Sequence, residues 1–197
     1  MPFFSDTGPG GFQPKRAFRF LINFTELSGL TFMAKTAAKP SYSMETKSHN
    51  VLNHVFNFPG VVKWEPISFT FIDAIDPNVG SKFYNALRNA GYVAPVSESN
   101  LITGVTKVAS TSALGEVRIQ QLDGGGIILP AGGDPGEVVG AVDQTTIVEE
   151  WTLKNAFIKG IKFGEGLSYE SEDLVEVSCD VIYDYATYSN NPVAYAG

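Results

Sequence analysis

The residues from Leu174 to Tyr188, LVEVSCDVIYDYATY, alternate between apolar and polar side chains over almost their whole length. The odd positions are apolar: Val175, Val177, Cys179, Val181, Tyr183 and Tyr185. The even positions are mostly polar: Glu176, Ser178, Asp180, Ile182 and Asp184. Successive side chains of a strand point to opposite faces, so this period of two predicts a β-strand with one buried face. A chain made of such strands must fold into sheets that bury their apolar faces against another layer.

Two earlier stretches have the same period. AFRFLINF, residues 17–24, places Phe18, Phe20, Ile22 and Phe24 on one face, and KWEPISFTFID, residues 63–73, does so with Ile67, Phe69 and Phe71. We expect GLTFMAKT, residues 29–36, to form a hairpin with the first of these strands. Residues 113–122 read as a short strand. Residues 150–169 are expected to pair antiparallel with Leu174–Tyr188 around the turn Glu170–Asp173.

One helix is predicted, over Asp76–Tyr92. Asp76 stands at the expected N-cap, Pro77 at the first helical position and Gly91 at the stop. Apolar residues recur at helical spacing, so one face can lie on a sheet: Val79, Phe83, Ala86, Leu87 and Ala90. The predicted fold class is α+β and mainly β, an antiparallel β-sandwich or open barrel with one packed α-helix.

The length of 197 residues favours one domain, which we place at residues 17–188. Residues 1–16 read as a flexible N-terminal arm and residues 189–197 as a C-terminal tail. Two stretches inside the domain lack a sustained period: a long polar loop at 37–60 and a Gly/Pro-rich insertion at about 123–143. Loops of that length inside a compact domain are usually functional or disordered.

Charge is distributed unevenly along the chain. Residues 1–136 contain 11 basic and 10 acidic side chains, a net charge of +1, whereas residues 137–197 contain 3 and 11, a net charge of −8. Tight binding to nucleic acid needs clustered Lys and Arg, which this C-terminal third lacks. The first 16 residues show no basic and apolar leader pattern, and no apolar stretch approaches the ~20 residues that span a bilayer, so we expect synthesis in the cytoplasm and no membrane anchor.

Catalytic and cofactor motifs are not found in the sequence. The two histidines, His49 and His54, are five residues apart with no cysteine nearby, which is not a zinc spacing. The glycines at 124–126 are not followed by the Lys-Ser/Thr of a phosphate-binding loop. Cys179, the single cysteine, falls on the apolar face of its strand, where a buried side chain is more common than a nucleophile. We therefore expect no enzymatic activity, no metal and no cofactor.

Three carboxylates share the polar face of the last strand: Glu176, Asp180 and Asp184. Residues four apart on a strand are roughly 13 Å apart, farther than the paired carboxylates of a glycosidase at about 5–9.5 Å. At that separation exposed like charges are screened by salt, because the Debye length is about 8 Å. The row is therefore predicted to be a wet surface rather than a catalytic centre.

The order of these elements resembles the tail tube proteins of contractile-tailed, T4-like bacteriophages, a family related to Hcp of type VI secretion and to R-type pyocin tubes. The resemblance rests on FRFLINF with GLTFMAKTAAKP, the long polar loop, WEPISFTFID leading into DPNVGSKFYNALRNAG, EEWTLKNAFIKGIKF, and the closing VEVSCDVIYDY. It covers most of residues 17–188. The segments 1–16, about 123–143 and the tail after Tyr188 exceed the compact core of that family.

The resemblance implies a structural protein whose sheets join between subunits into a ring-shaped barrel. Such subunits form homo-hexameric rings that stack into the inner tail tube, assemble with a sheath, a baseplate and a tape-measure protein, and conduct DNA during ejection without binding it tightly. The expected location is the virion. As hypotheses, Glu176, Asp180 and Asp184 face the bore, and one segment of the long loop reaches the next ring: Lys47, Ser48, His49, Asn50, Val51, Leu52, Asn53, His54, Val55 and Phe56.

Two alternatives remain open from the sequence. The same fold could serve as the tube of a type VI or extracellular contractile injection system, which carries effectors rather than DNA. A carbohydrate-binding or adhesion β-sandwich is the second, favoured by the Tyr and Trp content and expected as a monomer or small oligomer. For the carboxylate row, the competing interpretation is a face open to bulk solvent or the sheath, and for the long loop it is a floppy surface loop.

Overall fold

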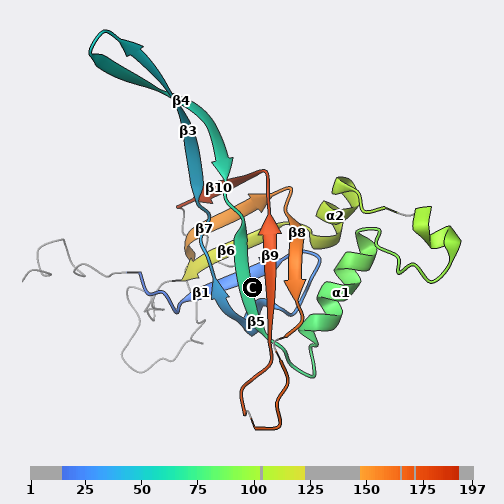
Figure 1. The fold of residues 1–197 in the computed structure, drawn as a ribbon. Coiled ribbons are helices and arrows are strands. Elements are labelled where there is room, and N and C mark those ends of the chain that lie inside the picture. The colour runs from blue at the N-terminus through green and yellow to red at the C-terminus, as the bar shows by residue number, and fades with distance from the viewer. Residues whose placement is uncertain (1–14, 103, 123–146, 165, 171, 191–197) are drawn as a thin grey trace, which may run out of the picture. The chain divides into compact units, whose positions relative to one another are not determined.

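A computed structural model describes residues 15–102, 104–122, 147–164, 166–170 and 172–190 (Figure 1). The strands are β1 (Phe20–Phe24), β2 (Ala34–Ala37), β3 (Tyr42–Val51), β4 (His54–Trp64), β5 (Ile67–Ile72), β6 (Val117–Leu122), β7 (Ile147–Lys154), β8 (Phe157–Lys162), β9 (Glu176–Ile182) and β10 (Tyr185–Ser189). The helices are α1 (Val79–Asn89) and α2 (Lys107–Leu114), with short 3-10 turns at Thr31–Met33 and Glu98–Ile102. Most of the arm, the insertion at about 123–143 and most of the tail lie outside the described residues.

The strands form three sheets, in the orders β1-β6-β7-β10, β2-β5-β9-β8 and β3-β4. The chain divides into two compact units, of which the larger comprises residues 22–119 and 151–188 and the smaller residues 1–21, 120–150 and 189–197. The predicted class, mainly β with antiparallel pairing, is confirmed, and no closed barrel is formed by the described strands.

In the smaller unit, polar groups tie the chain that enters β1 to its neighbours. Gln121 donates from Nε2 to the carbonyl oxygens of Arg16 at 2.7 Å and Arg19 at 2.8 Å. Lys15 forms an ion pair with Glu149, whose side chain is largely buried. A buried carboxylate is costly unless it is paired, so this contact helps to hold the entering chain in place.

The core of the larger unit is an aromatic cluster under α1. Phe24, Phe69, Phe71 and Phe83 are at most 3% exposed, and the ring of Phe83 lies 5.4 Å from that of Phe71 and 6.2 Å from that of Phe24. The second pair is edge-to-face, a geometry that aromatic quadrupoles favour. The apolar faces predicted for β5 and β9 are buried as expected, since Ile67 and Phe69 and their neighbours Val177, Cys179 and Val181 are almost inaccessible.

Helix α1 forms where the apolar spacing predicts it, but its first turn differs from the prediction. The N-cap is Asn78, whose side chain accepts from Ser81 N at 2.5 Å, and Asp73 Oδ1 accepts from Val79 N at 3.0 Å. The prediction of Asp76 as the cap was wrong. An N-cap side chain must reach the amide two or three residues on, and Asn78 is in the extended conformation that allows this.

One predicted strand pairing was also wrong, and one helix was not predicted. Residues 29–36 do not form a hairpin with the first strand: β2 pairs with β5, in the register Ala37↔Phe69, while β1 neighbours β6. Helix α2 occupies a stretch without a strong helical pattern and is started by Thr106, whose hydroxyl accepts from Ala109 N at 3.2 Å. It ends at Gly115, in the left-handed region with φ 71°, so β6 begins only at Val117.

The predicted strand Leu174–Tyr188 is divided into β9 and β10, which belong to different sheets. Between them Asp184 donates its backbone N–H to Lys154 O at 3.0 Å, which turns the chain away from β9. The long loop at 37–60 was also expected to lack regular structure, and instead it contains β3 and most of β4. Both differences follow from hydrogen bonds between residues far apart in the sequence, which no local period reports.

Candidate functional site

The most prominent surface feature of the larger unit is the hairpin of β3 and β4, which extends away from the sheet of β5 and β9 (Figure 1). All of β3 and all of β4 except Trp64 is exposed to solvent. At the turn Leu52 has φ 53° and is 96% exposed. A hairpin that buries no face against its own domain gains little by itself in water, so this one is built to be covered by something else.

The base of the hairpin is anchored and bent. The ring of Trp64 lies 5.5 Å from Tyr42 and 5.9 Å from Tyr183, which joins the hairpin to the core. The register shifts between Met44 and Thr46, where a Cβ on Gly60 would lie 2.7 Å from the carbonyl oxygen of Glu45. Only glycine fits there, and such a bulge increases the local twist and directs the strands beyond it.

An ion pair joins β3 to β4 beside this bulge. Lys63 Nζ contacts Glu45 Oε1, and this hydrogen bond, with the charge of the lysine, holds the pKa of Glu45 below its ordinary value. Ser43 Oγ also donates to Glu65 at 2.8 Å. The acidic side chains of this part of the chain, Glu45 and Glu65, thus both lie near the base of the hairpin.

The outer hairpin, residues Lys47–Phe58, contains no Asp or Glu, and its two faces differ. Directly paired residues of an antiparallel ladder present their side chains on the same face. One face, here called the basic face, is made by the pairs Lys47↔Phe58, His49↔Phe56 and Val51↔His54. The opposite face is made by Ser48↔Asn57 and Asn50↔Val55. Every basic side chain of the outer hairpin therefore lies beside an apolar one on a single face.

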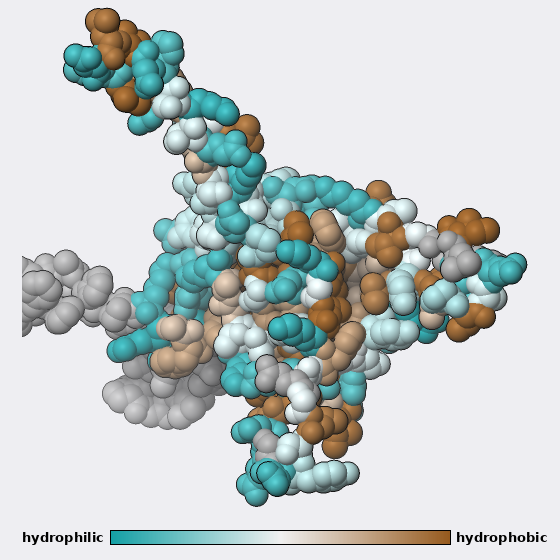
Figure 2. All heavy atoms as spheres, in the orientation of Figure 1, coloured by the Kyte–Doolittle hydropathy of each residue, from teal (hydrophilic) through white to brown (hydrophobic). Residues whose placement is uncertain are grey.

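The ten residues predicted to reach a neighbouring ring, Lys47 to Phe56, are brought together in this outer hairpin. Several of them are large apolar residues whose side chains are exposed to solvent, with Val55 63% and Phe56 52% exposed (Figure 2). A floppy loop was the competing interpretation, and the structure gives these residues a regular ladder instead. Whether they contact another ring stays a prediction.

The three carboxylates predicted to line a bore do not form one row. Glu176 and Asp180 share the outer face of β9, but Asp184 lies beyond the end of that strand. Each has a partner from a distant segment: Lys35 for Glu176, Ser68 Oγ at 2.5 Å for Asp180, and Lys107 Nζ at 2.7 Å for Asp184. Two lysines offset two of the three charges, so the local net charge is nearer −1 than −3.

Asp184 is a corner residue as well as a surface charge. Besides Lys107, the first residue of α2, it accepts from Asn155 Nδ2 at 2.8 Å. The hydrogen bond from Lys107, followed by that from Asn155, lowers the pKa of Asp184. This carboxylate joins α2 to the corner between β9 and β10, a structural role that the sequence pattern did not reveal.

Short hydroxyl side chains surround Asp180 on the outer face of the sheet β2-β5-β9-β8. The register places Ser68 opposite Asp180, Thr70 opposite Ser178, and Thr36 opposite Thr70. On β8 the same face continues with Lys162 opposite Ser178 and with Phe157 opposite Ile182. It is suited to contact with water.

Cys179 is buried, as the sequence predicted. Burial raises the pKa of its thiol to about 12, which disfavours the thiolate at neutral pH. No group of three or more His, Cys, Asp or Glu side chains that could hold a metal ion occurs among the described residues. No helix in the described part of the chain is long and apolar enough to cross a membrane.

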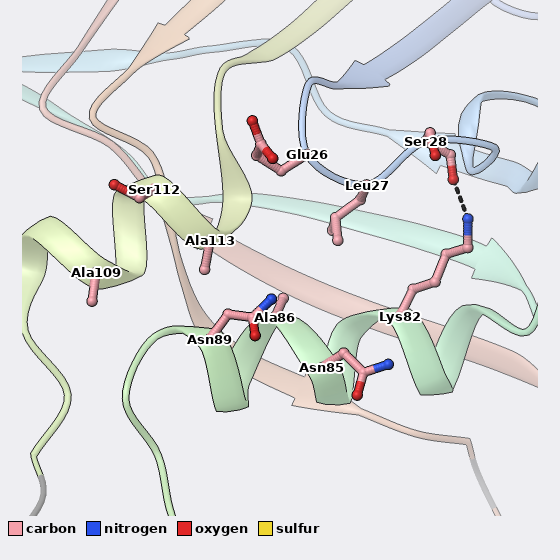
Figure 3. A pocket seen from close by; sticks show the side chains of 10 residues that line it. All are labelled: Glu26, Leu27, Ser28, Lys82, Asn85, Ala86, Asn89, Ala109, Ser112 and Ala113. Atoms are coloured by element: carbon pink, nitrogen blue, oxygen red, sulfur yellow. Dashed lines mark hydrogen bonds between the residues drawn. The ribbon is translucent and has the colours of Figure 1, made fainter.

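A polar cavity of about 380 Å³ lies between α1, α2 and the turn after β1 (Figure 3). Its walls carry Glu26, Asn85 and Asn89, and Lys82, which donates to the carbonyl oxygen of Ser28. Two serines, Ser28 and Ser112, complete its polar lining.

One exposed apolar segment was missed by the sequence prediction. The loop between β8 and β9, residues 163–175 and here called the acidic loop, exposes Leu167 at 87%, Leu174 at 68% and Tyr169 fully (Figure 2). The signal was present in the sequence as large apolar residues inside an acidic turn. The expected pairing of β8 with β9 around this segment is confirmed.

No protein-family model and no curated protein matches this chain. Solved structures do match. A chain of the cryo-EM structure of the anti-feeding prophage baseplate, 6-fold symmetrised, is 12% identical with a TM-score of 0.60, over 91% of this chain and 97% of that one.

Two further matches come from related assemblies. A chain of the sheath/tube terminator of the extracellular contractile injection system PVC, in the extended state, is 12% identical with a TM-score of 0.58, over 90% of this chain and 98% of that one. A chain of the anti-feeding prophage tube-terminating cap is 13% identical with a TM-score of 0.59, over 95% of this chain and 97% of that one. At this identity the likeness concerns the fold, and the resemblance to the tube-protein family is confirmed at that level.

Proposed function

We propose that this protein is a non-catalytic structural subunit of the inner tube, or of a tube terminator, in a contractile injection machine. The observation that carries the proposal is the agreement in fold over nine tenths of the chain with components of such machines, one of them 6-fold symmetrised. Hexameric rings that stack into a tube follow from this, with a sheath and a baseplate as the other partners. The more specific assignment is the tail tube of a contractile phage, in which the tube conducts DNA and a tape-measure protein sets its length.

The ends of the central sheet support assembly into rings. Among the described strands, β2 and β8 end the sheet β2-β5-β9-β8, and each pairs with one other strand. Exposed strand edges present unpaired backbone groups that invite pairing with another chain. A ring in which these edges meet between subunits removes them, because a closed barrel has no edge.

The outer face of the same sheet supports the assignment of a wet bore. It carries Thr36, Ser68, Thr70, Asp180 and Lys162, with Phe157 and Ile182 paired at one end. A conduit must not hold what passes through it, and a face of mostly short hydroxyls with a few charges of both signs offers no cluster of bases. In this proposal Asp180 and Glu176 face the lumen, and Asp180 contributes most to its charge because Glu176 and Asp184 are each paired with a lysine.

Electron microscopy and sedimentation of the purified full-length protein test the proposal. We expect six-fold rings, and at high concentration hollow tubes with a bore wide enough for a duplex. Deletion of Ser48–Phe56 removes the outer hairpin and is expected to leave rings that no longer stack. A protein that remains monomeric at every concentration, including in the presence of baseplate partners, would contradict the proposal and favour a sugar-binding sandwich.

A further inference from the structure

The outer hairpin and the acidic loop lie at opposite ends of the larger unit. The hairpin joins β5 at Ile67, which pairs with Val181, and the acidic loop joins β9 at Glu176, which pairs with Ile72. Because five residue steps separate the two pairs, the attachment points are about 17 Å apart along the sheet. Figure 1 shows the hairpin and the loop leaving the sheet in opposite directions.

The two ends have opposite charge. The basic face presents Lys47 with His49 and His54, in an outer hairpin that has no carboxylate. The acidic loop exposes Glu170 and Glu172 and contains no Lys, Arg or His. Complementary charge on two surfaces steers them together and fixes their register.

Both ends also expose apolar side chains. Beside the acidic loop is a hollow of about 780 Å³, lined by Leu167, Tyr169, Leu174 and Val175. Polar groups line it as well, namely Asp173, Ser168 and the ion pair of Lys35 with Glu176. The basic face offers projecting apolar side chains of a size that such a hollow holds: Val51, Phe56 and Phe58.

We propose that the basic face of the outer hairpin docks into the hollow of the acidic loop on a second copy of this chain, in the next ring. The inference rests on the proposed tube function and adds which surface receives the hairpin. A contact between two different surfaces of one chain is head-to-tail, so it repeats without limit along an axis and gives the stack a polarity. Burial of exposed apolar side chains drives the contact, and the charges select its orientation.

Charge reversal followed by mixing tests this docking directly. Variant A carries Lys47→Glu and His49→Glu, so its hairpin and its loop are both acidic. Variant B carries Glu170→Lys, Glu172→Lys and Asp173→Lys, so that its loop, left with one of four carboxylates, is basic like its hairpin. We expect each variant alone to need at least about tenfold more protein to stack than the wild type, because like charges then face each other across the contact. A mixture of A and B is expected to stack in alternation, since each hairpin then meets a loop of opposite charge.

A matched control places the same two carboxylates on the opposite face of the hairpin, as Ser48→Glu and Asn50→Glu. This variant is expected to stack as the wild type does. Recovery in the mixture also shows that neither reversed variant is misfolded. Electron microscopy with sedimentation at fixed salt reads out all five samples: the wild type, variants A and B, their mixture and the control.

The remaining outcomes separate the two proposals. If the wild type stacks but the A–B mixture does not recover stacking, the docking is overturned and the tube function stays intact. The same holds if the control loses stacking as strongly as variant A. A wild type that forms rings without stacks would also overturn the docking. A wild type that stays monomeric under every condition would overturn the tube function, and the docking with it.

Discussion

Phe83 is the side chain through which α1 is tied to the sheet, and truncating it tests that account of the core. It is fully buried, with its ring 5.4 Å from that of Phe71 and 6.2 Å from that of Phe24. Phe83→Ala removes that burial and both ring contacts, a loss of about 3–5 kcal/mol for a buried phenylalanine. Since a domain is stabilised by about 5–15 kcal/mol in total, the variant should fold but unfold early.

Thermal and urea denaturation of the unassembled protein, followed by circular dichroism, measure the effect. For a chain of this length 1 kcal/mol shifts Tm by about 2–4 °C, so we expect Phe83→Ala to melt about 6–20 °C below the wild type. The control is Tyr84→Ala, the adjacent residue of the same helix, which is 44% exposed and should change stability by about 0.5 kcal/mol. If both variants lost the same stability, α1 would not pack on the sheet through Phe83 and the aromatic core described here would be wrong.

Three further predictions concern single groups. Cys179 should resist a thiol reagent at neutral pH until denaturant unfolds the protein, because burial raises its pKa to about 12; rapid labelling of the native protein would refute this. Glu116→Gln should lower the free energy of unfolding by up to about 1 kcal/mol at neutral pH. The hydrogen bond from Lys154 lowers the pKa of Glu116 in the folded state, so its stabilisation is lost as the pH falls through that value, and urea titrations of variant and wild type should converge in acid. Gly60→Ala should leave the melting temperature nearly unchanged but reduce stacking, because its Cβ would lie 2.7 Å from the carbonyl oxygen of Glu45; tubes equal to those of the wild type would contradict the role of the bulge.

The outer hairpin shows how far the candidate site could be predicted. Ten of its residues, Lys47 to Phe56, were identified from the sequence as a segment that reaches a neighbour, but not as two paired strands. A period of two appears only when one face of a strand is buried, and both faces of this hairpin are exposed within its own chain. The exposed apolar residues of the acidic loop were missed for a different reason: whether a side chain in a loop is exposed depends on the fold around it.

Local sequence patterns were sufficient to predict which face of a half-buried strand is apolar. Val177, Cys179 and Val181 are inward because alternation on β9 leaves one face apolar, and α1 lies where its apolar spacing predicts. These features depend on neighbours within a few residues, so a local pattern is enough to specify them.

Strand pairing and the partners of the charged side chains became evident only from the folded chain. It joins β2 to β5 rather than to β1, ends β9 before Asp184, and supplies Lys35 and Lys107 to carboxylates 141 and 77 residues away. Such contacts follow from how whole apolar faces cover one another, because burial has no direction and many pairings satisfy the same local pattern. The choice among them is made only when all the faces are covered at once.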